Sequence, residues 1–148
     1  MAISSYLVDT NVLLRLALRD NSDHGVVQSA VAKLQGANAA LFFTHQNISE
    51  FWNVATRSEE QNGFGLSVAE VEREVQSIER GLTLLPDSEA LYHEWRRVVV
   101  DYQVRGLQVH DARLAAAMLV HGIPHILTLN VEDFRRYRGI TAVHPGSL

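Results

Sequence analysis

The chain has 148 residues, which suits one domain with a hydrophobic core and is too short for two. Hydrophobic residues make up 47% of it and charged residues 20%, as in soluble globular proteins, which excludes a disordered or fibrous chain. The net charge of -4 excludes a protein held on nucleic acid by phosphate contacts alone, and the absence of cysteine excludes disulfides and thiolate metal sites.

Strands and helices alternate along the first half of the chain. An apolar run predicts a strand over residues 6–8, and helical spacing of apolar residues predicts helices over 12–18 and 26–34. A second apolar run predicts a strand over 40–44, and a helix follows over 47–57. The first half therefore reads as strand, two helices, strand and helix.

The second half continues the alternation after a loop at residues 59–65. Ser67 and Glu70 have the spacing of a capping box and predict the start of a helix. The expected elements, in order, are a helix to about 80, a strand over 82–86, a helix over 88–105 ended by Gly106, an alanine-rich helix over 110–122, a strand over 125–129, a turn or short helix over 131–139, and a strand over 140–143.

Alternating strands and helices predict a mostly parallel sheet, because parallel neighbours require crossover connections. We therefore expect an α/β fold, a three-layer α/β/α sandwich, in a single domain over residues 1–148. Sheets of this kind bind ligands beyond the carboxyl ends of their strands.

Acidic side chains follow several of the predicted strands. Asp9 comes directly after the first strand, Glu50 lies six residues beyond the second, and Asp111 opens the alanine-rich helix. Asn130 and Asp133 come just after the strand at 125–129. In a parallel sheet these positions lie at one edge, so the side chains are expected to converge.

Clustered carboxylates repel one another and raise each other's pKa unless a cation neutralises them. Carboxylate, amide and water oxygens suit magnesium or manganese, and magnesium keeps waters that contact a substrate phosphate. One or two such ions could activate water for phosphodiester hydrolysis. A metal site therefore accounts for a carboxylate at the end of a core strand.

Each acid also has an ordinary structural explanation. Asp9 is a good N-cap for the helix after it, and Asp111 and Asp133 stand where acids favour helix starts. Glu50 could be a solvated helix residue. The coincidence of four acids at one edge favours the site.

Four motifs together resemble the PIN domain, and specifically the VapC-type toxin ribonucleases of bacterial toxin–antitoxin pairs. They are "YLVDTNVLLRL", "NISEFWNVATR", "HDARLAAAM" and "TLNVEDF", in this order. The resemblance implies an α/β/α fold, Mg2+- or Mn2+-dependent endonuclease activity on RNA, homodimers, and inhibition by a cognate antitoxin protein.

The resemblance also assigns roles by position. Asp9, Glu50 and Asp111 match the three acids on which the family relies, as catalytic residues and metal ligands. Many members have an aspartate directly after the last asparagine, whereas here Val131 follows Asn130. Asp133 is therefore expected to complete the metal site.

Polar residues beside these acids match family positions that orient ligands or water, although local capping explains them nearly as well. They are Thr10, Asn11, Thr128 and Asn130. The arginines considered for RNA backbone contacts are Arg15, Arg113 and Arg136.

Two other functions remain open. Asp9 could be a phosphorylated nucleophile, as in aspartyl-phosphate phosphatases or phosphotransferases, but Asn11 stands where a phosphatase needs a second aspartate and Lys33 is too early for a receiver domain. Alternatively, the chain could be a catalytically silent PIN fold that binds RNA or protein. No segment resembles a membrane span or signal peptide, so we expect a cytoplasmic protein without membrane contact.

Overall fold

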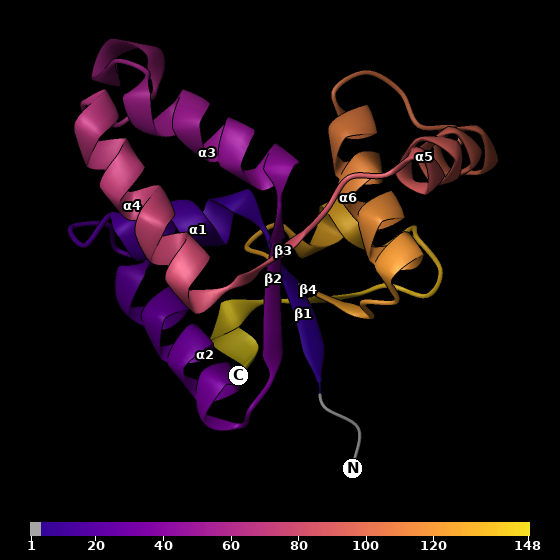
Figure 1. Cartoon of the computed structure of the whole chain (residues 1–148), viewed down its shortest axis with the longest axis horizontal. Coiled ribbons are helices and arrows are strands. Elements are labelled where there is room, and N and C mark those ends of the chain that lie inside the picture. The colour runs from indigo at the N-terminus through magenta and orange to yellow at the C-terminus, as the bar shows by residue number, and fades with distance from the viewer. Residues whose placement is uncertain (1–3) are drawn as a thin grey trace.

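A computed structural model describes residues 4–148 of the chain (Figure 1). These residues form one five-stranded sheet with helices packed on it. The strands are β1 (Ser5–Val8), β2 (Ala40–Thr44), β3 (Thr83–Leu85), β4 (His125–Leu127) and β5 (Thr141–Val143); the α-helices are α1 (Thr10–Ala17), α2 (His24–Gly36), α3 (His45–Thr56), α4 (Val68–Gly81), α5 (Glu89–Asp101) and α6 (Gln108–His121); the 3-10 helices are η1 (Glu59–Gln61), η2 (Val131–Phe134) and η3 (Pro145–Ser147).

The sheet is parallel throughout, in the order β3-β2-β1-β4-β5. In the central strand, Leu7 is in register with Phe42 of β2 and Ile126 of β4. The chain runs outward from β1 to β3 and then returns to β4 on the other side of β1. The strand order thus reverses beside β1, and the carboxyl end of β1 lies at the point where open α/β sheets bind ligands.

Alternate residues of the strands enter two separate cores, because successive side chains of a strand point to opposite faces. Tyr6 and Val8 pack with residues of α1 to α4, whereas Leu7 packs with residues of α5 and α6. Figure 1 shows these two sets of helices on opposite sides of the strands. The predicted three-layer α/β/α architecture is therefore confirmed.

The alanines of α6 let this helix lie close to the sheet. Ala112, Ala115 and Ala116 are fully buried beside Leu7 and Ile126. Small side chains shorten the distance between packed elements, so α6 carries its polar first turn close to the carboxyl end of β1.

The helix predicted over residues 88–105 is wrong at its carboxyl end. Helix α5 ends at Asp101 because Gln103 has a left-handed φ of 53°, and the Val104 N–H donates to the Val99 carbonyl oxygen. Glycine usually takes this position, so a glutamine there does not predict a helix end, and Gly106 lies beyond the end of α5.

Smaller differences affect other boundaries. Helix α6 begins at Gln108 rather than residue 110, so Asp111 lies within its first turn instead of opening it. The strand predicted over 125–129 ends at Leu127, and the Thr128 hydroxyl donates to the Asp9 carboxylate. Between residues 4 and 148, no helix has the length and apolar character needed to cross a bilayer.

Candidate active site

Asp9 lies at the carboxyl end of β1 and is only 7% exposed. As the N-cap of α1, its Oδ1 accepts from the Thr10 N–H at 2.7 Å, and its Oδ2 accepts from the Thr128 hydroxyl at 2.8 Å. Burial, followed by the charges of Asp111 and Glu50, raises the pKa of Asp9 to about 7, against the lowering effect of these hydrogen bonds. The Asp9 charge is therefore poorly compensated by the protein alone.

A buried polar network fixes the start of α3 against α1. Thr44 donates through its N–H and its hydroxyl to Asn47 Oδ1, at 2.8 and 2.9 Å, and Thr44 Oγ1 accepts from the Asn47 N–H at 3.2 Å. Asn47 Nδ2 then donates to Thr10 Oγ1 at 3.1 Å. This capping box orients α3 so that Glu50 lies less than one turn beyond Asn47.

Gln46 connects Glu50 to helix α6. Its Nε2 donates to Glu50 Oε1 at 2.9 Å and to the His110 carbonyl oxygen at 2.8 Å. Its Oε1 accepts from Arg113 Nη1 at 3.3 Å. Both polar atoms of this buried amide are therefore hydrogen-bonded. Its contacts to α6 fix the Gln46 side chain, which in turn holds the Glu50 carboxylate.

Asp111 occupies the half-buried first turn of α6. Burial, and then the charges of Asp133 and Glu50, raise the pKa of Asp111 to about 6, while His110 and Arg136 lower it. These effects couple Asp111 to Glu50 and Asp133, and Asp9 to Asp111 and Glu50.

The remaining predicted polar residues pack between β1 and the end of β4. Asn11 donates through Nδ2 to Thr128 Oγ1 at 3.4 Å and accepts from the Leu129 N–H at 3.2 Å. Thr128 Oγ1 also accepts from the Asn130 N–H at 3.0 Å. Thr128 is completely buried and connects Asp9 to the segment that carries Asp133, whose own side chain is exposed in η2.

The acids at this edge suit a hard divalent cation, because carboxylates offer oxygen ligands and neighbouring negative charge raises the pKa of Asp9 and of Asp111. In the described part of the chain, however, no three His, Asp or Glu side chains are arranged to hold an ion directly. The residues therefore fit an ion that retains much of its water shell and contacts one or two carboxylates.

The three arginines considered from sequence differ in position. Arg15 lies in the last turn of α1 and pairs with Asp23 at 3.9 Å, which directs it toward α2. Arg113 contacts Gln46 beside Glu50, and Arg136 lies over the Tyr137 ring at 5.5 Å, where its charge reaches Asp111. Only the last two border the acids.

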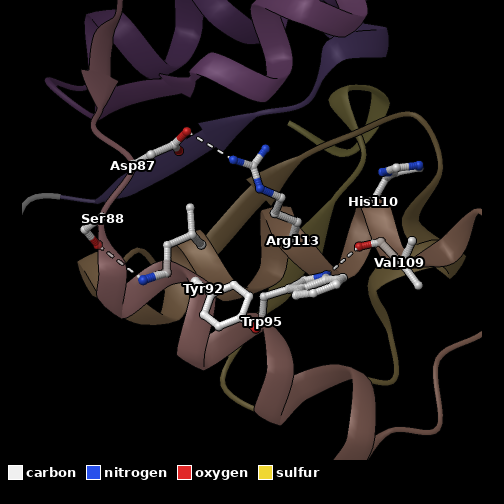
Figure 2. A pocket seen from close by; sticks show the side chains of 8 residues that line it. Asp87, Ser88, Tyr92, Trp95, Val109, His110 and Arg113 are labelled. Carbon is white, nitrogen blue, oxygen red and sulfur yellow. Dashed lines mark hydrogen bonds and ion pairs between the residues drawn. The ribbon is translucent and has the colours of Figure 1, made fainter.

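Two neighbouring pockets lie along the first turns of α6. One, of about 440 Å³, is lined by Glu50 and by residues of α3 and α6. The other, of about 560 Å³, lies against α5 and is drawn in Figure 2. His110 and Arg113 line both pockets, so the two pockets adjoin at these residues.

Sequence reasoning missed the residues that position the acids rather than the acids themselves. Thr44 and Asn47 have capping spacing, which was a usable signal, whereas the contacts of Gln46 to His110 and Arg113 join different helices. No local sequence pattern predicts contacts between helices that are distant in the chain.

The fold and the acidic edge agree with a family-level comparison: the PIN domain model matches residues 6–140, and the chain belongs to the PIN domain family. Among curated proteins, no sequence matches significantly.

Solved structures with a similar fold include toxin–antitoxin proteins. VapBC2 from Rickettsia felis, bound to a DNA fragment from its promoter, has a TM-score of 0.68 at 12% identity, over 95% of this chain and 98% of that chain. FitAcB from Neisseria gonorrhoeae has a TM-score of 0.67 at 15% identity, over 97% and 99%. VapC20 from Mycobacterium tuberculosis, a sarcin-ricin loop cleaving toxin, has a TM-score of 0.62 at 16% identity, over 83% and 87%.

Proposed function

We propose that this protein is a divalent-metal-dependent endoribonuclease and the toxin of a toxin–antitoxin pair. The observation that carries the proposal is the group of acids beyond the carboxyl end of β1, where the strand order reverses and where Asp9 is buried. Membership of the PIN family supports the same chemistry, since PIN nucleases generally use a divalent metal.

Asp9, Glu50 and Asp111 would hold the cation, one or two of them directly and the rest through its waters, and Asp133 would complete the site. Mg2+ or Mn2+ supplies charge that neutralises the scissile phosphate and lowers the pKa of a bound water. Thr128 and the Thr10 N–H hold the Asp9 carboxylate in a fixed orientation through both of its oxygens. Gln46 holds Glu50, and Arg113 offers a guanidinium to the RNA backbone.

The proposed partners follow from the structural neighbours. One of these is a toxin–antitoxin complex from Klebsiella pneumoniae, and VapBC-5 from Mycobacterium tuberculosis is a member of a family of toxin–antitoxin systems. We infer a cognate antitoxin that covers the acidic edge, a homodimeric toxin, and action in the cytoplasm on cellular RNA.

Cleavage of RNA by purified variants tests the activity. Asp9→Asn and Asp111→Asn remove a charge from the acidic edge while keeping the side-chain size, so Mg2+-dependent cleavage should fall to background. Asp20→Asn, an exposed acid in the turn after α1, is the matched control and should cleave as wild type does. Full activity in purified Asp9→Asn would remove Asp9 from the mechanism.

Two other outcomes would support the alternative functions. An acyl-phosphate on Asp9 after exposure to a phosphodonor would indicate a phosphotransferase. RNA binding that is insensitive to a chelator, with no cleavage of a broad RNA panel, would indicate a silent binding module.

A further inference from the structure

We propose that the pocket between α5 and α6 binds an unpaired nucleobase of the RNA strand, next to the phosphate at the acidic edge. This inference rests on the proposed nuclease function and adds to it a subsite for the substrate.

Two aromatic side chains of α5, those of Tyr92 and Trp95, form the walls of this pocket (Figure 2). The Trp95 indole N–H donates to the Val109 carbonyl oxygen at 2.9 Å, which fixes that ring, while Tyr92 is 51% exposed. Leu91, which is 5% exposed, also lines the pocket. Bases of single-stranded RNA bind proteins by stacking on aromatic faces such as these.

The size of the pocket suits one nucleotide. Its volume of about 560 Å³ falls inside the range of small-ligand sites, roughly 300–1,000 Å³. Its lining is mainly apolar, with a few polar groups at the rim that include Asp87 and Ser88. This combination matches the flat apolar faces and polar edge of a base.

The position of Arg113 argues for a base of the substrate strand rather than for an unrelated ligand. Its Nη2 donates to Asp87 Oδ2 at 3.0 Å and its Nη1 to Gln46 Oε1 at 3.3 Å, so the guanidinium lies between the aromatic pocket and Glu50. An RNA strand that has one phosphate at the acids and the neighbouring base against Tyr92 would run alongside the Arg113 guanidinium. An arginine at this position is well suited to bind a phosphate of the RNA backbone.

Binding measurements that do not depend on catalysis test the subsite. Full-length Asp9→Asn protein in metal-free buffer would be titrated against labelled short single-stranded oligoadenylate, oligocytidylate and oligouridylate. Adding Tyr92→Ala should raise the Kd for at least one of them by roughly tenfold, because a stacking face is lost. Tyr92→Phe keeps the ring and should keep the Kd. Val100→Ala, which changes an exposed residue of α5 outside the pocket, should also keep it.

An abasic nucleotide in the same oligonucleotide identifies the stacked position. One abasic site should weaken binding to Asp9→Asn about as much as Tyr92→Ala does, and should have little effect when Tyr92 is already alanine. Equal Kd values for Tyr92→Ala and its parent would overturn the subsite. So would a loss of self-association in Tyr92→Ala with unchanged RNA binding, since this face would then be an interface between copies.

Cleavage assays in the wild-type background separate this inference from the proposed function. Cleavage with an unchanged KM in Tyr92→Ala would overturn the base pocket and leave the nuclease intact. Tyr92-dependent binding without any cleavage would overturn the nuclease and retain the pocket as an RNA-binding site.

Discussion

At the scale of single residues, the chemistry of the site depends on charges that the fold holds in unfavourable surroundings. Asp9 receives two hydrogen bonds, yet burial still raises its pKa to about 7. Charged groups placed in this way reduce stability, and proteins commonly retain them where function requires them.

The pH dependence of stability follows from the raised pKa of Asp9. The folded protein keeps the proton up to about pH 7, whereas the unfolded chain releases it near 3.8, so raising the pH through this interval favours unfolding. Asp9→Asn does not ionise, and in metal-free buffer at about pH 8 its Tm should equal or exceed that of wild type. This advantage should shrink as the pH falls toward about 4.

Thermal unfolding followed by circular dichroism across this pH range measures the difference. A Tm for Asp9→Asn far below wild type at every pH would show that Asp9 serves mainly as a cap for α1.

Substitution of Gln46 tests how Glu50 is positioned, since Gln46 contacts Glu50 without being a candidate metal ligand. Gln46→Met keeps the side-chain length and removes the hydrogen bonds, so Glu50 is no longer held. We expect a loss of roughly tenfold or more in kcat or in the affinity for Mg2+, as is usual for residues that orient metal ligands.

The Mg2+ concentration that gives half-maximal cleavage is the informative readout, because a purely structural defect would not shift it. Gln76→Met, which changes an exposed glutamine of α4, is the control. An unchanged kcat and an unchanged Mg2+ requirement in Gln46→Met would contradict the positioning role.

At the scale of elements, local sequence signals identified most helices and strands but not the contacts among them. The apolar runs at β1 and β2 and the capping residues Ser67 and Glu70 lead directly to the observed elements. The bond between Asn47 and Thr10 joins residues 37 positions apart and could be seen only in the folded chain. The left-handed backbone conformation of Gln103 ends α5, and a glutamine side chain does not predict this conformation.

The capping box at the start of α4 is expected to contribute to stability. Ser67 Oγ accepts from the Glu70 N–H at 3.1 Å, and both residues are exposed. Ser67→Ala leaves that N–H without its cap and should lower the free energy of unfolding by about 1 kcal/mol. Denaturant unfolding measures this change, and RNA cleavage should remain at the wild-type rate because α4 carries no residue of the candidate site.

Ser29→Ala, an exposed serine inside α2, serves as the control and should have little effect on stability. A Ser67→Ala protein as stable as wild type would show that the start of α4 is held by its packing alone.

In the whole molecule, the parallel sheet explains why acids that are distant in sequence lie on segments at the same edge. The return of the chain from β3 to β4 places Asp9, at the end of the central strand, between the segments that carry Glu50 on one side and Asp133 on the other. The sequence indicated this edge because strand ends of a parallel sheet align. It could not indicate the pocket between α5 and α6, which depends on how the two helices pack.

We expect these acids together to bind a divalent cation, and a crystal structure of the full chain grown with Mn2+ would show whether they do. The anomalous signal of the metal should lie at the carboxyl end of β1, with at least one of Asp9, Glu50 and Asp111 in direct contact and the others joined to the ion through water. Crystals of Asp9→Asn should lose that signal. Wild-type crystals with no metal at this edge, or with a metal bound only elsewhere, would contradict this expectation.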